Sequence, residues 1–593
     1  MRHRIDLSGY WAGRLELNPE IDVAAPAVVE QDFFVPLPWN KQIEHLRWPG
    51  EKTELTNVVE RLGNQNFRLV QRKFNEGVIV YRRELRLPSP PAGADERVFL
   101  VFEGSNYSTE VAVNGQPVGG HEGGHLAFEF DVSDALAAGV NVLEVKVDNR
   151  RRPDACPREQ FNWMDYGGMY RPVCLEWRPA VHIVGCAVRS GRDGQGWYAD
   201  ITVEMSGPPR GPVTAGIVSG RERGQARLEG QGAGLRGRVR LADPVVWEVG
   251  QGGLSQVRVV YAPDKGAPDE CEGHFGFRTI AAADRRILVN GRAVRILGAC
   301  WHEHHAVFGN SVPSWQVDHD IQLMKHAGLN AIRAAHYPHA QGFYDACDRA
   351  GMLVTAELPC WQFDEPQFAN PAVRKLATGM AGEMVRQLGN HPCIFGWVIQ
   401  TESETYQPGG IEFFRAVNDA FTQADPERLT ISAGDPGPAG HLDIVTEKKD
   451  PPPAPKLTDE FVDVLGIHSY HGWYGGRAQD LGETLDRNHA QRKARLFLAT
   501  EVGAEGVLGL RSLEMHPWTE DYQAELLCRH IRTILDRDFM AGFFIWLFMD
   551  YECSSIGIRG INSKGLVDEY RRPKLSFNMV KALLAQRRAE GKV

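Results

Sequence analysis

The sequence is poor in the features that mark several classes of protein. Its 593 residues contain ten cysteines, which are scattered singly and form no C-x-x-C pair. In a long chain without a visible secretion signal, this spacing predicts free buried thiols and argues against a disulfide framework or a zinc site. No stretch approaches the roughly 20 apolar residues that span a membrane. The longest apolar run, residues 541–549, suits a buried strand.

An excess of basic charge and a targeting signal are also missing. Lys and Arg number 66 against 76 Asp and Glu, which gives a formal net charge of −10. This balance argues against nucleic acid as a partner, because phosphate binding needs a basic face. Residues 1–7 are charged and contain no apolar run, so we expect no signal peptide, no membrane partner and a cytoplasmic location. The composition is that of an ordinary globular protein, and the length predicts roughly three or four domains.

The first half of the chain has the pattern of β-sandwiches. Short alternating runs, such as residues 78–85 and 97–102, are separated by turn residues. Asn-Gly pairs at 114–115 and 290–291 lie between β-forming residues and predict two hairpins. We expect one β-sandwich over residues 1–180. A second, immunoglobulin-like sandwich is expected over residues 181–281, where short strands alternate with Gly- and Pro-rich turns.

From residue 282 onward, short apolar strands alternate with helical stretches. Eight strands in about 300 residues, with helices between most of them, predict a parallel (β/α)8 TIM barrel over residues 282–593. The expected strands are residues 294–297, 331–333, 353–355, 394–399, 430–432, 464–467, 496–500 and 543–546. A Pro-rich segment at 450–455 follows the fifth strand and is predicted to be a surface loop.

In such a barrel, functional side chains stand at the carboxyl ends of the strands. Those ends carry Arg333, Glu357, Glu402, His468, Glu501 and Trp546. Glu402 and Glu501 each come at the end of a buried strand, where the fold itself needs no carboxylate. One such glutamate could cap the next helix or lie in solvent on a loop. Two of them, on the fourth and seventh strands, indicate a functional pair.

Cleavage of a glycosidic bond requires a pair of carboxyl groups. One must be protonated to assist the leaving oxygen, and the other must be ionised to attack or support the oxocarbenium-like carbon. Their surroundings must therefore separate their two pKa values. Strands four and seven face each other across the barrel mouth, so the two carboxyl groups can lie about 5–5.5 Å apart, as in retaining enzymes. The sequence thus favours a glycosidase whose strand positions permit the retaining spacing, although the sequence does not supply the distance itself.

Four segments resemble glycoside hydrolase family 2, which contains β-galactosidases, β-mannosidases and β-glucuronidases. They are residues 165–173, residues 333–338 with 344–351, residues 390–402, and residues 500–504. The resemblance covers nearly the whole chain. It implies that the first sandwich is a jelly-roll-like sugar-binding domain, that Glu402 is the acid/base and that Glu501 is the nucleophile.

The resemblance also implies how the substrate is held. His302 aligns with a sugar-contacting position, and Tyr470, the first tyrosine after strand six, aligns with one that faces the nucleophile, although it could also be a packing aromatic. Independently of the resemblance, Trp546 ends strand eight, where we expect it to form the floor for the sugar ring. No metal or other cofactor is implied, and the partner is a carbohydrate or glycoconjugate substrate. Relatives are commonly dimers or tetramers, which implies a homo-oligomer. The full set of expected substrate contacts is Asn162, His302, Arg333, His336, Thr401, His468, Tyr470, Trp546, Asn562 and Lys564.

Three departures from the family pattern leave alternatives open. Thr401 stands where the family has the Asn that bonds the substrate 2-hydroxyl, and relatives of the glucuronidase type have Asn in place of His468 and of Leu547. A different hypothesis is therefore a carbohydrate-binding protein without turnover. Glu404 is an alternative acid/base. The segment 301–305 looks metal-like, but its spacing is not H-E-x-x-H.

Asn562 and Lys564 form an N-x-K motif like that of β-glucuronidases. In a loop, residues i and i+2 can point to one side, so the ammonium can pair with the C6 carboxylate of a uronic acid while the amide donates to it. A neutral hexose would leave this lysine unpaired in a desolvated pocket. The motif predicts a β-linked uronic acid, glucuronate first and galacturonate next. A neutral sugar, as in β-galactosidases, is the alternative if Lys564 is a solvated loop residue.

Overall fold

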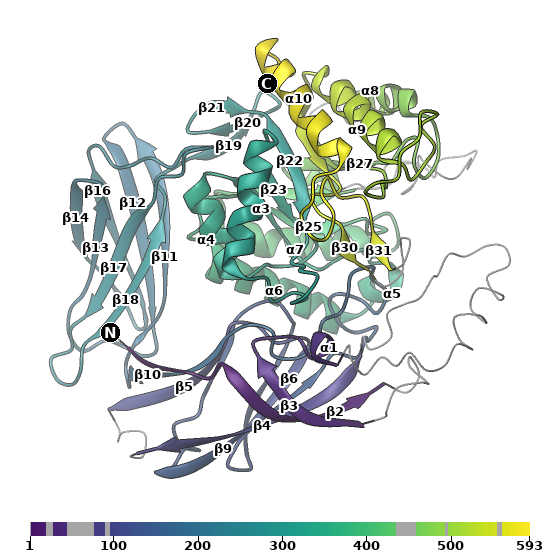
Figure 1. Ribbon diagram of the computed structural model, residues 1–593. Helices are drawn as coiled ribbons and strands as arrows, with labels where there is room; N and C mark the ends of the chain where they lie inside the picture. Colours follow the sequence, from purple (N-terminus) through teal and green to yellow (C-terminus); the bar gives the residue numbers. More distant parts are fainter. Residues whose placement is uncertain are drawn as a thin grey trace.

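The computed structural model describes residues 2–18, 28–43, 76–88, 95–434, 458–492, 496–553 and 560–593. These residues form two β-sandwiches and a closed barrel, as the sequence predicts. Figure 1 shows the first sandwich below the barrel and the second beside it. The Pro-rich segment 450–455, predicted to be a surface loop, lies outside the described residues.

The N-terminal sandwich consists of a six-stranded and a four-stranded sheet around a shared apolar core. The predicted Asn-Gly hairpin joins β6 to β7, with φ of 53° at Asn114 and 78° at Gly115, a conformation that these two residues adopt readily. Its sheets follow the orders β3-β2-β4-β9-β6-β7 and β1-β10-β5-β8. The strands are β1 (His3–Asp6), β2 (Gly9–Leu17), β3 (Val28–Val35), β4 (Gly77–Leu87), β5 (Glu96–Phe102), β6 (Ser108–Val113), β7 (Gln116–Glu122), β8 (Phe128–Asp131), β9 (Gly139–Asp148) and β10 (Val173–Pro179), with the short helix α1 (Trp39–Gln42) after β3.

The second sandwich has two four-stranded antiparallel sheets with orders β11-β12-β16-β15 and β14-β13-β17-β18. Alternate residues of their strands face one buried apolar core. The strands are β11 (Ile183–Asp193), β12 (Gly196–Met205), β13 (Val213–Ser219), β14 (Glu222–Arg227), β15 (Glu229–Gln231), β16 (Gly234–Leu241), β17 (Ser255–Tyr261) and β18 (Asp269–Phe275).

A small three-stranded sheet leads into the barrel. It comprises β19 (Ile280–Ala283), β20 (Arg286–Val289) and β21 (Arg292–Val294), and the predicted turn at Asn290 and Gly291 pairs β21 with β20. The first barrel strand therefore begins at Ile296, later than expected, because the hairpin uses the residues before it.

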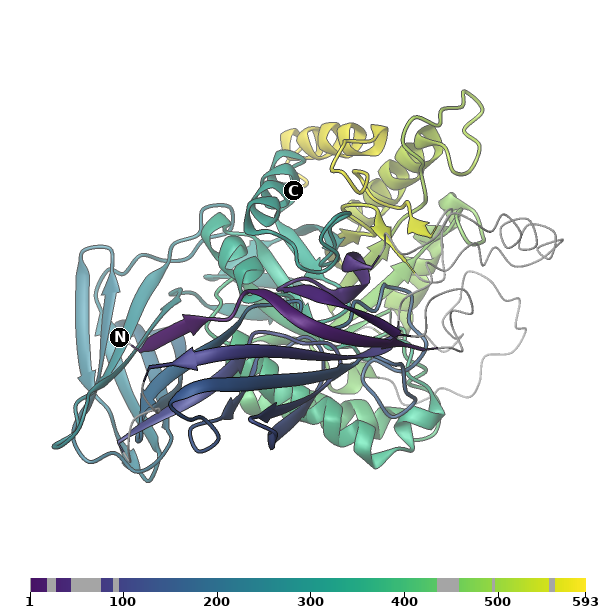
Figure 2. The ribbon, with the colours of Figure 1, turned by 60° about the horizontal axis from the view of Figure 1, so that its bottom comes forward.

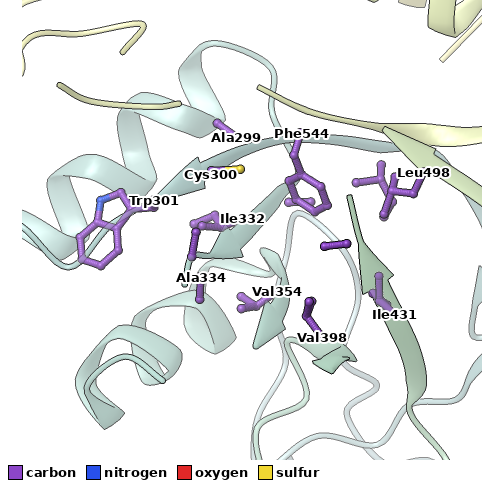
Figure 3. Packing of buried hydrophobic residues seen from close by; sticks show 14 of the residues in the cluster. Ala299, Cys300, Trp301, Ile332, Ala334, Val354, Val398, Ile431, Leu498 and Phe544 are labelled. Atoms are coloured by element: carbon purple, nitrogen blue, oxygen red, sulfur yellow. The ribbon is translucent and has the colours of Figure 1, made fainter. Parts of the chain in front are cut away.

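The barrel is closed by eight parallel strands in sequence order. Their buried runs are nearly continuous, as expected where helices cover the outside of a parallel sheet. Figure 3 shows side chains that fill the interior, among them Ile332, Val398 and Phe544. The strands are β22 (Ile296–Trp301), β23 (Ala331–Ala334), β24 (Leu353–Glu357), β25 (Ile394–Thr401), β26 (Leu429–Ala433), β27 (Val464–Ser469), β28 (Leu496–Val502) and β29 (Met540–Ile545).

The helices between the strands begin and end at residues that can cap a helix. Asn370 caps the start of α6 by accepting from the Ala372 N–H, and Gly351 ends α4 in the left-handed region. The helices are α3 (Ser314–His326), α4 (Gln341–Ala350), α5 (Glu365–Phe368), α6 (Pro371–Leu388), α7 (Gly410–Ala424), α8 (Leu481–Gln491), α9 (Glu520–Leu535) and α10 (Leu575–Ala589). Two short 3-10 helices, Thr458–Glu460 and Ala478–Asp480, and the strands β30 (Tyr551–Glu552) and β31 (Ile561–Asn562) complete the barrel domain.

The N-terminal sandwich is joined to the barrel by buried polar contacts. Arg171 donates to the carboxylate of Glu303 at 2.8 Å and to the Pro338 carbonyl at 3.1 Å. Figure 2 shows this sandwich lying along the barrel. None of the ten cysteines, all of which lie in the described residues, forms a disulfide, and seven of them are buried, so the prediction of buried thiols is confirmed for those seven. None of the helices in the described part of the chain has both the length and the apolar character that a membrane crossing requires.

Candidate active site

Glu402 follows β25 at the carboxyl end of the barrel. Its φ of 52° lies in the left-handed region, where a residue with a β-carbon is strained. Its N–H donates to the Ala433 carbonyl at 3.0 Å, and its side chain remains 23% exposed. Oε2 accepts from Gln362 Nε2 at 3.0 Å. Glu404, the alternative acid, accepts instead from Gln407 on its own loop.

Glu501 is a buried residue of β28 whose two oxygens have separate donors. Oε1 accepts from Arg333 Nη1 at 2.7 Å, and Oε2 accepts from the Tyr470 hydroxyl at 2.5 Å. Burial, together with the charge of Glu501, raises the pKa of Tyr470 well above its ordinary value, so its hydroxyl keeps its proton and donates. One carboxylate oxygen of Glu402 and one of Glu501 lie within 4.8 Å of each other. This approach of the two oxygens is compatible with the roughly 5–5.5 Å between the carboxyl groups of retaining glycosidases.

Beneath this pair, Arg333 is fully buried and binds two carboxylates. Its Nε donates to Glu357 at 3.0 Å, and its Nη2 donates to Thr401 Oγ1 at 3.0 Å. Glu357 also accepts from Thr401 at 2.5 Å, and its other contact is with His336 Nδ1 at 2.8 Å. Burial alone would raise the pKa of Glu357, but the charge of Arg333, with His336 and Thr401, lowers it to about 2.

This network changes what Thr401 can do. We expected its hydroxyl to replace the family's Asn in binding the substrate. In the structure Thr401 is fully buried and gives its one hydroxyl proton to Glu357. A hydroxyl has only one proton to donate, so in this arrangement Thr401 supports the buried carboxylate and has none left for the sugar.

His468, at the end of β27, lies between the two carboxyl groups of the candidate pair. Its Nδ1 is 2.6 Å from Glu402 Oε1, and its Nε2 is 3.4 Å from Glu501 Oε1. The register of β27 against β28 pairs His468 with Glu501 directly. The structure thus places an imidazole in contact with both carboxyl groups.

Aromatic side chains form the wall beside the pair. The ring of Trp546 stacks on His336, with centroids 4.9 Å apart, and meets His302 edge-on at 5.4 Å. Burial lowers the pKa of His302 well below its ordinary value, so its ring is neutral. The N-terminal sandwich contributes Trp163, 5.5 Å from His336. The neighbouring Asn162 is buried, and its Oδ1 bonds no described residue.

The N-x-K loop holds its lysine in a buried ion pair that the sequence analysis did not predict. Lys564 Nζ donates to Glu505 Oε1 at 2.9 Å, and both side chains are 1% exposed. Lys564 is therefore neither solvated nor unpaired. Nζ lies 5.1 Å from the ring centroid of Tyr474, which is 5.0 Å from that of Tyr470. Asn562 Oδ1 accepts from the Lys564 N–H at 3.2 Å and holds the loop in shape.

Within the described residues, two groups of side chains could hold a metal ion. They are Glu402, His468 and Glu501, and Asp345, Asp348 and His391. In the second group the Asp348 carboxylate lies 2.6 Å from His391 Nδ1 and accepts from the Cys393 N–H at 2.9 Å. These contacts suit a structural role for Asp348. The metal-like segment 301–305 is in neither group.

Two residues near the site escaped the sequence analysis. Glu505 could have been found, because it comes four residues after Glu501 and a buried lysine needs a carboxylate partner. Nothing in the sequence pointed to Gln362, because its contact with Glu402 depends on a loop turn in which Gln362 itself has a φ of 51°.

Comparison with known proteins shows which family the chain matches. The family model of the glycosyl hydrolases family 2 TIM barrel domain matches residues 280–588, and that of the family's sugar binding domain matches residues 18–179. The chain is 27% identical over 578 residues to a β-glucuronidase of Bacteroides fragilis, covering 91% of this chain and 79% of the relative. It is 25% identical over 535 residues to a β-glucuronidase of Paenibacillus borealis, covering 83% of this chain and 85% of the relative.

Two solved structures have the same fold over nearly their whole length. The family 2 β-galacturonidase of Eisenbergiella tayi bound to galacturonate matches with a TM-score of 0.80 at 25% identity, covering 99% of this chain and 97% of that one. The β-glucuronidase of Bifidobacterium dentium, complexed with coumarin-3-O-glucuronide, matches with a TM-score of 0.82 at 24% identity, covering 98% and 97%. The chain therefore belongs to glycoside hydrolase family 2.

Proposed function

We propose that the protein is a retaining exo-β-glycosidase that removes a terminal β-linked uronic acid, with Glu501 as nucleophile and Glu402 as acid/base. The observation that carries the proposal is the pair itself: the two carboxyl groups have oxygens within 4.8 Å of each other at the carboxyl ends of strands β25 and β28. Family membership supports the reaction class. The alternative of a binding protein without turnover does not explain why both carboxyl groups are retained at this spacing.

Two displacements at the anomeric carbon make up the reaction. In the first, a Glu501 oxygen forms a bond to C1 while the bond from C1 to the leaving oxygen breaks, and Glu402 gives its proton to that oxygen. In the second, Glu402 takes a proton from water, the water oxygen forms a bond to C1, and the bond from Glu501 breaks. Arg333 and Tyr470 hold the two Glu501 oxygens in place by donating to them.

The choice of a uronic acid rests on the N-x-K loop and on the relatives, which are β-glucuronidases and a β-galacturonidase. Lys564 is held by Glu505, so a substrate carboxylate would join an existing ion pair. An ammonium has three donors, which allows it to bind both carboxylates at once. Glucuronide is the first candidate, and galacturonide is the second because of the Eisenbergiella tayi neighbour.

The test compares kcat/KM for the 4-nitrophenyl β-glucuronide, β-galacturonide, β-galactoside and β-glucoside. Wild type should prefer a uronide. A Lys564→Met variant leaves Glu505 buried without its partner, so the matched control is the double variant Lys564→Met/Glu505→Gln, which removes both charges at similar volume. Both variants should lose roughly 10- to 100-fold on the uronides, the value of one charged hydrogen bond, and far less on neutral sugars. A wild type that prefers a neutral sugar, or variants unchanged on the uronides, would refute the uronide assignment.

A further inference from the structure

Tyr551 is a buried residue whose hydroxyl lacks a partner. The residue is 1% exposed, and its hydroxyl makes no hydrogen bond to any residue that the structure describes. Burial raises the pKa of this hydroxyl well above its ordinary value, so it keeps its proton and can donate it. Buried polar groups in native proteins are nearly always hydrogen-bonded, because leaving one unpaired costs free energy. A bound ligand that supplies the missing acceptor would explain the exception.

The backbone places Tyr551 beside the N-x-K loop. Strand β30 pairs with β31 in antiparallel register, and Tyr551 lies directly opposite Asn562. Residues that face each other in an antiparallel ladder turn their side chains to the same side of it, with their β-carbons about 4.5–5.5 Å apart. The phenol of Tyr551 and the amide of Asn562 therefore share one side of this two-stranded sheet. Because a tyrosine side chain is the longer of the two, its hydroxyl extends further from the ladder than the amide does.

The ring of Tyr551 is also part of the aromatic wall of the candidate active site. It stacks on His302 with the ring centroids 4.3 Å apart, and it meets Trp546 edge-on at 6.4 Å. The Nε2 atom of His302 is likewise buried and has no hydrogen bond to a described residue. The wall therefore holds two neighbouring uncharged rings, each with a polar atom that the described protein leaves unpaired. This is the arrangement expected of a site that binds an oxygen-rich ligand.

We propose that Tyr551 is a substrate-binding residue that donates its hydroxyl proton to the C6 carboxylate of the bound uronic acid. This inference rests on the proposed function, because it assumes that a uronide binds at the N-x-K loop. An ionised carboxylate has two oxygens with about four lone-pair sites, so it can accept from Tyr551, from the amide of Asn562 and from the ammonium of Lys564 together.

The hydroxyl adds selectivity that the lysine alone does not give. Lys564 is already paired with Glu505, so its charge is shared between that carboxylate and the one on the substrate. The Tyr551 hydroxyl has no competing partner among the described residues, and a hydrogen bond from it to an ionised carboxylate is of the stronger, charge-assisted kind. A neutral hexose, which has a hydroxymethyl group at C6, would gain less from this donor, so Tyr551 favours uronides.

The test is Tyr551→Phe, which keeps the ring and its stacking and removes only the hydroxyl. We would measure kcat/KM for the 4-nitrophenyl β-glucuronide, β-galacturonide, β-glucoside and β-galactoside. A fifth substrate, the 4-deoxy β-uronide, serves both uronides, because the two differ only in configuration at C4. Inhibition constants of free glucuronate and galacturonate report binding without turnover. Tyr81→Phe, in the core of the N-terminal sandwich, is the matched control, and thermal unfolding is recorded for all three proteins without ligand.

Tyr551→Phe should lose roughly 10- to 100-fold in kcat/KM on the preferred uronide, the value of one charged hydrogen bond. It should lose as much on the 4-deoxy uronide, far less on the neutral sugars, and bind the free uronic acid more weakly. Its unfolding midpoint should be no lower than that of wild type, because the hydroxyl it lacks is unpaired in the free enzyme. Tyr81→Phe should keep the wild-type preference among the sugars.

Three results would overturn the proposal. A loss that disappears on the 4-deoxy uronide would show that the hydroxyl binds the C4 hydroxyl and not the carboxylate. Equal losses on uronides and neutral sugars, or a lowered unfolding midpoint with unchanged kinetics, would show that the hydroxyl has a structural role only. A wild type that prefers a neutral sugar contradicts the proposed function, and this inference falls with it. A wild type that prefers a uronide, with Tyr551→Phe unaltered, contradicts the inference alone.

Discussion

Arg333 joins Glu357 and Glu501, two carboxylates that would otherwise repel each other in a buried site. Its guanidinium donates to both, at 3.0 Å and 2.7 Å. Burial and fixed geometry make this contact stronger than a surface ion pair. Strand-end positions in the sequence were enough to find all three residues. Their pairing was not predictable, because it depends on which side chains meet across the barrel, and the same holds for the ion pair of Lys564 with Glu505.

Glu357 gives the fold a dependence on pH. Its pKa of about 2 lies below the ordinary value of 4.5, so its stabilising effect is present above about pH 4.5 and is lost as pH falls toward 2. The full effect is on the order of 3 kcal/mol. Between about pH 6 and about pH 3.5, wild type should lose roughly 1 kcal/mol more unfolding free energy than Glu357→Gln, measured by urea denaturation. Equal losses in the two proteins would show that Glu357 is not held ionised by this network.

The carboxyl ends of the barrel strands determine where the candidate active site lies. All eight barrel strands were predicted from apolar runs, since strands covered on both faces read as continuous apolar segments. The predicted start of the first barrel strand was wrong, because the residues before Ile296 belong to the Asn290-Gly291 hairpin. Conformations such as the positive φ of Glu402, Gln362 and Gly434 could not be predicted, because tertiary contacts impose them.

Replacing Gly434 with Ala tests whether the end of β26 sets the position of the His468 imidazole. The new β-carbon would meet His468 at 2.7–2.9 Å, so kcat/KM should fall by at least about 10-fold as the ring is displaced. Gly409→Ala is the matched control: its φ of +80° is also left-handed, but the nearest atom is at 3.5 Å. Both variants should lose roughly 1 kcal/mol of stability from backbone strain, and only the first should lose activity. Equal activity in the two variants would contradict this role.

The N-terminal sandwich forms part of the candidate active site, although the barrel carries the two carboxyl groups. It supplies Asn162 and Trp163 to the wall, and Arg171 fastens it to the barrel at the loops after β22 and β23. The resemblance to family 2 motifs predicted that this sandwich would accompany the barrel. The buried pair of Arg171 and Glu303 could not be predicted, since 132 residues separate the two.

Arg171→Met should therefore destabilise the protein strongly. Glu303 would remain buried without its cation, and breaking a buried pair in this way costs about 3–5 kcal/mol. The matched control is Arg238→Met, which breaks the exposed pair with Asp200 on the second sandwich and should change stability little. Thermal unfolding of both variants, with activity measured below the transition, makes the comparison. Similar unfolding midpoints for the two would contradict a stabilising role for the interdomain pair.

Azide rescue of a Glu501→Gly variant tests whether Glu501 is the nucleophile of a retaining glycosidase, as we propose. Without the nucleophile, kcat on the preferred aryl β-glycoside should fall by several orders of magnitude. Azide, small enough to enter the space left by the carboxylate, should restore turnover and form the α-glycosyl azide, whose configuration NMR reads directly. Near-normal activity in the variant without azide, or a β-configured azide product, would show that Glu501 is not the nucleophile.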